Sequence, residues 1–231
     1  MDLIVIIVFL IISLIILQIV YDINFKKIKE IAENNKKLDD EIKKYPSNIE
    51  ICKSILKKLK NEDVEIVEEK NAGNCLYIAI TNKIIIANMR DSFTRVQTIA
   101  HECLHSIQNR RILIFNYIFS NIYILSFFII AILSLTGIIK EKMLFLMIYM
   151  ILGFIHYFVK SYLENDAMIK ARFVAKQYLE EQKISSDEDI ENIINEYDIL
   201  NSIGIKAINY DMFLKICLKT IILAVIMLIN I

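Results

Sequence analysis

The sequence carries no excess of charge of either sign, because 27 Lys and Arg residues balance 27 Asp and Glu residues in a chain of 231. A basic surplus is the usual sign of a nucleic-acid partner, and an acidic surplus that of a cationic one. Internal repeats and low-complexity linkers are also missing. We therefore expect a single domain, residues 1–231, with no nucleic-acid partner.

The 4 cysteines form no CxxC pair and follow no regular spacing. The sequence therefore indicates neither a disulfide framework nor a zinc site built from thiolates. Each cysteine is expected to be a small buried hydrophobic side chain in a reducing compartment.

Charged residues are missing from several long stretches of this chain, which is 56% hydrophobic and has a mean hydropathy of +0.48. A helix of about 20 apolar residues is long enough to cross a bilayer. The stretches that approach this requirement are residues 3–21, 112–139, 143–160 and 213–231. The last contains Lys215 and Lys219 near its start, where long side chains can extend to the interface. The sequence thus predicts a mainly α, multi-pass helical membrane protein with about four spans, for which the lipid bilayer is a partner.

Positive residues gather on one side of these predicted spans, as they do in cytoplasmic loops. They are Lys26, Lys27, Lys29, Arg110, Arg111 and Lys160. On the other side lie only Lys140 and Lys142, together with Glu141. This asymmetry predicts a multi-pass protein of the cell membrane, with the N-terminus outside and residues 22–111 and 161–212 in the cytoplasm.

The first cytoplasmic part has the pattern of a small α+β fold. Ser47 and Glu50 have the spacing of a capping box and predict a helix to about Lys60. Three strand candidates follow, "VEIVEE", "LYIAI" and "IIIANM", and the last leads into a predicted helix over residues 92–110. After the third span, "SYLENDAMIKARFVAKQYLEEQ" is expected to continue the helix, and Ser185 with Glu188 to cap another.

The predicted helix over residues 92–110 contains two of the 3 histidines, in the stretch "TIAHECLHSIQ". Its apolar stripe consists of Val96, Ile99, Cys103 and Ile107. On the opposite side, His101 and His105 lie one turn apart, so both imidazoles can reach one zinc ion and Glu102 can activate a zinc-bound water. Because His-Glu-x-x-His also arises by chance in roughly a few chains per thousand, a third ligand is needed to support the prediction.

Two residues further along the chain are candidates for this third ligand. His156 lies inside the third predicted span, where a helix-packing role is the better interpretation. Glu164 lies just beyond that span, and the intervening hairpin returns the chain to the membrane face that carries the motif. Asp166 follows closely and is expected to orient a ligand histidine.

The succession of "NKIIIA", "TIAHECLHSIQ", a hydrophobic hairpin and "ENDAMIKA" resembles the YugP-like family of membrane neutral zinc metallopeptidases over most of the chain. That family's pattern is His-Glu-x-x-His-Ala-x-Gln, a hairpin, and then Glu-x-Asp-Ala. The resemblance implies a zincin-like portion of the gluzincin type that acts on a peptide or membrane-protein substrate. It implies His101, His105 and Glu164 as ligands of one catalytic Zn²⁺, Glu102 as the catalytic base, and Asp166 as the second acidic position.

Three positions depart from the family pattern: Leu104 replaces glycine, Ser106 replaces alanine, and Met168 replaces a small polar residue. Of these, Leu104 raises a question about close packing beside the metal. The related HtpX and CAAX-prenyl-protease group ends in Glu-x-x-Ala-Asp, which Met168 fits less well. Intramembrane site-2 proteases bury the motif in an apolar span, whereas charged residues flank it here.

Together these features predict a membrane metalloendopeptidase that hydrolyses peptide bonds with a zinc-activated water at the cytoplasmic membrane surface. An extended substrate is expected to add as a strand to an exposed edge near "IIIANM". No residue stands out as the oxyanion-stabilising donor, for which Arg172 and Tyr210 are unranked candidates. The alternatives are a non-catalytic membrane scaffold or sensor, and an inactive descendant that binds zinc without turnover. A transporter is less well supported, because the spans contain few charged or helix-breaking residues.

Overall fold

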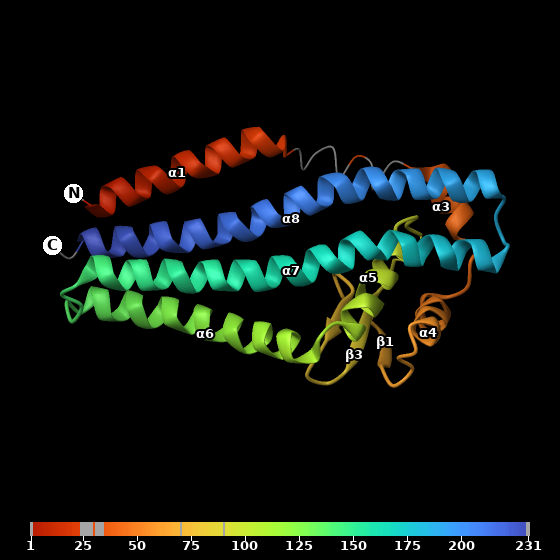
Figure 1. Ribbon diagram of the computed structural model, residues 1–231, viewed down its shortest axis with the longest axis horizontal. Coiled ribbons are helices and arrows are strands. Elements are labelled where there is room, and N and C mark those ends of the chain that lie inside the picture. The colour runs from red at the N-terminus through yellow and green to blue at the C-terminus, as the bar shows by residue number, and fades with distance from the viewer. Residues whose placement is uncertain (1, 24–29, 31–34, 70, 90, 230–231) are drawn as a thin grey trace. The chain divides into compact units, whose positions relative to one another are not determined.

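The computed structural model in Figure 1 describes the whole chain except residues 1, 24–29, 31–34, 70, 90 and 230–231. Its helices are α1 (Asp2–Tyr21), α3 (Lys36–Ile42), α4 (Asn48–Lys58), α5 (Arg95–Ile107), α6 (Arg110–Leu135), α7 (Lys142–Gln182) and α8 (Asp187–Ile229). Its strands are β1 (Glu65–Glu69), β2 (Leu76–Ile78) and β3 (Lys83–Ala87). The prediction of a mainly helical protein with a small sheet is confirmed. Lys26, Lys27 and Lys29, on which the predicted orientation partly depends, lie outside the described residues, as does the end of the fourth predicted span.

Four helices, α1, α6, α7 and α8, are long and apolar enough to cross a membrane. Their number agrees with the sequence prediction, but two of the helical bounds do not. The second span was expected to reach residue 139, yet α6 ends at Leu135, because Gly137 adopts a φ of 70° and its N–H donates to the carbonyl of Ser134. A glycine in this left-handed conformation is a common helix terminator.

The other difference concerns α8, a single helix where the sequence predicted a cytoplasmic helix and a separate span. Its first residue follows Ser186, whose hydroxyl accepts a hydrogen bond from the N–H of Asp189 at 3.2 Å. The expected cap, Ser185, instead donates to the carboxylate of Glu41 at 2.7 Å. The capping position was therefore wrong by one residue, because either serine satisfies the local pattern and only the tertiary contact with Glu41 separates them.

The described residues form two compact units. The first consists of residues 1–23, 115–162 and 206–231, and within it α1, α6 and the adjoining parts of α7 and α8 run alongside one another (Figure 1). Its interior includes Tyr123, Tyr149, Ile216 and Leu223. Many large apolar side chains point outward, such as Phe9, which is 63% exposed. An apolar outer surface of this kind is suited to lipid rather than to water.

The second unit consists of residues 24–114 and 163–205 and contains the three-stranded sheet, in the order β1-β3-β2. Strand β3 is parallel to β1 and antiparallel to β2. Helix α4 begins with the predicted capping box, in which the Ser47 N–H donates to Glu50 at 2.9 Å. The parts of α7 and α8 in this unit contribute Ala171, Tyr178 and Ile193 to the core.

The prediction of an exposed sheet edge near "IIIANM" was wrong. Among the described residues, β3 is the central strand, and Ile84 and Ile86 within it are each 0% exposed. Because β1 pairs in parallel with the far side of β3, the third strand in the sequence becomes the second in space. The edges are β1 and β2, and an unbroken apolar run is typical of the central position that β3 occupies.

Helix α5 lies in the core of the second unit through the predicted stripe residues Val96, Ile99 and Cys103, each 0% exposed. Ile107, the fourth member of that stripe, is 46% exposed because it is the last residue of the helix. The predicted helix extended to residue 110, but the chain leaves helical geometry at Gln108 before α6 begins at Arg110.

One charged residue on α5, Arg95, is fully buried, which the sequence did not predict. Its guanidinium donates to the carbonyls of Ile42 at 2.7 Å, Tyr45 at 2.9 Å and Pro46 at 3.0 Å. It also donates to the side chain of Asn48 at 3.0 Å. Carbonyls at a helix C-terminus attract a positive charge, so Arg95 holds the end of α3 and the start of α4 against the N-terminus of α5.

Candidate metal centre

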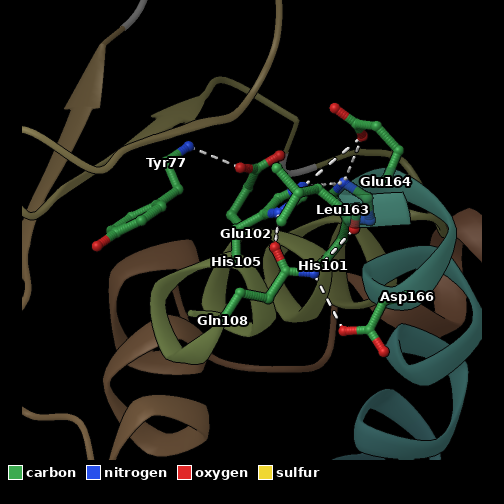
Figure 2. A network of polar contacts seen from close by, with 8 residues as sticks. All are labelled: Tyr77, His101, Glu102, His105, Gln108, Leu163, Glu164 and Asp166. Carbon is green, nitrogen blue, oxygen red and sulfur yellow. Dashed lines mark hydrogen bonds and ion pairs between the residues drawn. The ribbon is translucent and has the colours of Figure 1, made fainter. Parts of the chain in front are cut away.

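Three potential metal ligands come together in the second unit, two from α5 and one from α7 (Figure 2). The Nε2 atoms of His101 and His105 are 3.0 Å apart. The Oε2 atom of Glu164 lies 3.5 Å from the first and 3.7 Å from the second. Tetrahedral zinc with bonds of about 2.0–2.2 Å requires ligand atoms about 3.3–3.6 Å apart. The three atoms therefore have close to the separations that one zinc ion needs, although the whole of α6 lies between His105 and Glu164 in the sequence.

The position of Glu164 depends on α7 being continuous through this region, from Lys142 to Gln182. Glu164 therefore projects from a rigid helical turn and not from a loop. The neighbouring core residues Leu163, Ala167 and Ala171 are buried and recur at helical spacing, which fixes the rotation of α7 in this unit. That rotation directs Glu164 towards the two histidines on α5 (Figure 2).

Gln108, just after the end of α5, sets the tautomer of His105. Its Nε2 donates to the carbonyl of Leu163 at 2.8 Å and to Asp166 Oδ2 at 3.1 Å, and both of these oxygens can only accept. Its Oε1 therefore faces His105 Nδ1, at 2.8 Å, and accepts a hydrogen bond from it. With the proton on Nδ1, the Nε2 of a neutral His105 ring keeps a lone pair for a metal.

The electrostatics of the cluster favour a bound cation. Burial by itself opposes the charged form of Glu164, but its contacts with His101 and His105 hold the pKa of this carboxyl well below its usual value. Burial likewise lowers the pKa of His105, yet Glu164 and Gln108 raise it by more than that. A carboxylate that stays ionised beside two imidazole nitrogens is the donor chemistry of a zinc site with one open position.

Glu102 lies beside these three residues and is only 7% exposed. Its Oε2 accepts a hydrogen bond from the backbone N–H of Tyr77, on β2, at 2.7 Å (Figure 2). Burial raises the pKa of Glu102, and the nearby rings of His101 and His105 offset part of that rise. A partly desolvated carboxylate with a raised pKa is better matched to proton transfer near neutral pH than an exposed one.

Asp166 reaches the cluster through Gln108, whereas the sequence suggested direct orientation of a histidine. Besides Gln108, it contacts the Lys170 ammonium at 2.5 Å, and these partners lower its pKa against the opposing effect of burial. Sequence reasoning did not select Gln108 as a site residue. The signal was available, because Gln108 shares the polar side of the helix and occupies the last position of the motif that carries the resemblance.

The other site candidates from the sequence, His156, Arg172 and Tyr210, are not among the residues that converge on the metal centre. His156 belongs to the first unit, where its ring stacks on Tyr123 with centroids 5.5 Å apart, as a helix-packing residue would. Arg172 forms an ion pair with Asp198, and its guanidinium lies over the Phe173 ring. Tyr210 also belongs to the first unit. The site geometry therefore brings together His101, Glu102, His105 and Glu164, and adds Gln108.

Comparison of the chain with protein-family models, with curated proteins and with solved structures finds no match in any of the three.

Proposed function

We propose that this protein is a zinc-dependent membrane metalloendopeptidase, the activity implied by its resemblance to the YugP-like family. One observation carries the proposal: the donor atoms of His101, His105 and Glu164 lie within 4.8 Å of one another. Chance occurrence of His-Glu-x-x-His would not bring a carboxylate from another helix to both imidazoles. The buried Glu102 beside them supplies the remaining group that the chemistry needs.

A zinc ion bound there would polarise the substrate carbonyl and lower the pKa of a coordinated water. Glu102 takes the proton from the attacking water and later delivers it to the leaving amine, as a general base and then a general acid. The N–H of Tyr77 holds the carboxylate of Glu102 in position, so one of its oxygens is free to exchange protons. His105 is kept in the metal-binding tautomer by Gln108.

Strand β2 is the best candidate for the surface that binds an extended substrate. It is an edge strand among the described residues, and its Tyr77 lies next to Glu102. Leu76, also on β2, is 54% exposed and offers an apolar contact. A peptide that paired along this strand would present its backbone to Glu102.

The proposed location is the cell membrane, with the active site on the cytoplasmic side. Four apolar helices of spanning length support membrane insertion. The sidedness is supported by the distribution of Lys and Arg around the predicted spans. Proteolytic access to residues 163–205 in sealed vesicles of known orientation would test it.

The proposal is tested by the metal content and the metal-dependent activity of detergent-purified protein. We expect about one zinc per folded chain, as one catalytic site requires, and cleavage of a mixed peptide library that stops after chelation and returns when zinc is added back. Folded protein without zinc would contradict the proposal and favour a non-catalytic scaffold or sensor. Zinc without any cleavage would favour an inactive descendant. Cleavage only at prenylated C-termini would favour the HtpX and CAAX-protease-like alternative.

Replacement of Gln108 tests the role of this residue in shaping the site. Gln108→Ala removes the acceptor of His105 Nδ1 and both donor contacts to α7, so zinc affinity should fall by about 10- to 100-fold. Gln108→Glu restores the acceptor but not the donors, and should recover only part of the affinity. Zinc affinity is measured by competition with a chromogenic chelator.

Gln97→Ala is the matched control for this experiment. Gln97 lies on the same helix, but its side chain donates to Asn201 at 2.9 Å and not to a histidine. Its replacement should leave zinc affinity unchanged. Equal losses in the Gln97 and Gln108 variants would mean that the effect comes from general destabilisation of α5.

A further inference from the structure

The first unit contains a pocket lined by positive residues from two helices, in a region that is otherwise apolar. The pocket has a volume of about 80 Å³ and lies among α6, α7 and α8. Its lining residues are Tyr123, His156, Tyr157, Lys160, Met212, Lys215, Ile216 and Lys219. This is several times the roughly 10–15 Å³ that a cavity needs to hold one water molecule, so a small polar group such as a phosphate can enter.

The positive charge of this pocket is not fully balanced by carboxylates. Lys215 pairs with Asp211 at 2.5 Å. In the part of the chain that the structure describes, Lys160 and Lys219 form no such ion pair. The ammonium of Lys219 lies 5.1 Å from the centroid of the Tyr123 ring, a contact that stabilises a cation but does not neutralise it.

A second observation also points to a ligand. Tyr123 is 1% exposed and stacks on the buried Tyr149 with ring centroids 4.7 Å apart, and among the described residues the two hydroxyls have no hydrogen-bond partner beyond each other, so one hydroxyl proton lacks an acceptor. A buried polar group without a partner costs free energy, so a ligand oxygen at this position would be stabilising. The pocket therefore combines a buried tyrosine pair that lacks one acceptor with two lysines that form no ion pair.

We propose that this pocket binds the phosphate-bearing headgroup of an anionic phospholipid. The phosphate would accept from the ammonium groups of Lys160 and Lys219 and from the Tyr123 hydroxyl. Lys160 is the last residue of the third predicted span and Lys219 lies near the start of the fourth. By the charge rule, these are the cytoplasmic ends of both spans. Anionic lipid is concentrated in that leaflet, and basic pockets between membrane helices bind such headgroups. The proposal rests on the membrane insertion proposed above but not on peptidase activity.

Native mass spectrometry of the detergent-purified full chain, titrated with phosphatidylglycerol or phosphatidylcholine, tests this site. We expect phosphatidylglycerol to bind at least about tenfold more tightly than the zwitterionic lipid. The double variant Lys160→Gln, Lys219→Gln should lose at least about tenfold in affinity for phosphatidylglycerol, since each lysine near an anionic lipid contributes about fivefold. The matched control, Lys140→Gln with Lys206→Gln, removes the same charge from exposed positions in the same unit and should bind like the wild type.

Tyr123→Phe separates ligand binding from a structural role. It removes a hydroxyl whose one possible partner among the described residues is the Tyr149 hydroxyl, so the fold should lose at most the small stabilisation of one hydrogen bond, while affinity for phosphatidylglycerol should fall at least about fivefold. Equal affinity for the two lipids, or equal losses in the pocket and control variants, would overturn the proposal. Displacement of phosphatidylglycerol by inorganic phosphate at equal concentration would overturn the lipid assignment in favour of a soluble anion. Zinc content, measured in the same samples, should be unchanged and keeps this result separate from the test of peptidase function.

Discussion

Glu102→Gln is expected to lower peptide hydrolysis by about 100- to 10,000-fold while leaving the zinc content unchanged. The amide has nearly the shape of the carboxylate and can still accept the hydrogen bond from Tyr77, which is 2.7 Å long in the structure. It cannot take a proton from water, however, so the chemical step loses its general base. Because Glu102 lies outside the group of three converging donor atoms, its neutralisation should not release the metal.

The measurement is a comparison of kcat/KM and of bound zinc in the same preparations. Glu69→Gln is a suitable control, since Glu69 is an exposed residue of β1 in the same unit. Zinc retention together with loss of activity would separate Glu102 from the ligands. Unchanged hydrolysis would refute its role as the base, and simultaneous loss of zinc would indicate that it acts as a ligand instead.

Glu164→Ala is expected to lower zinc affinity by more than about 100-fold. A residue that merely orients a ligand accounts for about 10- to 100-fold, and loss of a ligand should exceed that. The reason is both geometric and electrostatic. Glu164 supplies the third donor, at 3.5 and 3.7 Å from the imidazole nitrogens, and the only negative charge among the three ligands. Affinity is measured by chelator competition, with helix content followed by circular dichroism.

Glu180→Ala controls for the loss of a carboxylate from α7. Glu180 lies on the same helix, is exposed, and pairs with Lys176 at 3.7 Å. Its replacement should leave zinc affinity unchanged, and Glu164→Asp should retain part of it because the carboxylate is only withdrawn by one methylene. If Glu164→Ala binds zinc like the wild type, the two histidines account for zinc binding without Glu164. The assignment of Glu164 as the third ligand would then be wrong.

Much of the fold could be predicted from the sequence because the signals are local. Apolar length and missing charge indicated α1, α6, α7 and α8, and the Ser47–Glu50 spacing located the start of α4. The strand candidates and the helix that bears His101 and His105 followed from periodicity and from turn residues. These features depend on the properties of neighbouring residues along the chain, which a sequence records directly.

The sequence alone was less informative where residues far apart compete for the same space. It could not show that β3 is the central strand, because strand order depends on the parallel pairing of β1 across a long connection. It also missed Arg95, an arginine that is 0% exposed, whose partners are carbonyls about fifty positions away in the chain. Every residue has a backbone carbonyl, so no sequence pattern indicates which carbonyls will bind a buried arginine.

The candidate metal site also has a part that the local sequence determined and a part that depended on tertiary packing. The sequence determined that His101 and His105 lie one turn apart with Glu102 between them, because an α-helix fixes that spacing. It made Glu164 a candidate third ligand but could not establish contact. Only the tertiary structure decided that Glu164 meets both imidazoles and that Gln108 joins His105 to α7. The physical reason is that the rotation of α7 about its axis, which directs Glu164, is set by the packing of Leu163, Ala167 and Ala171 in the core.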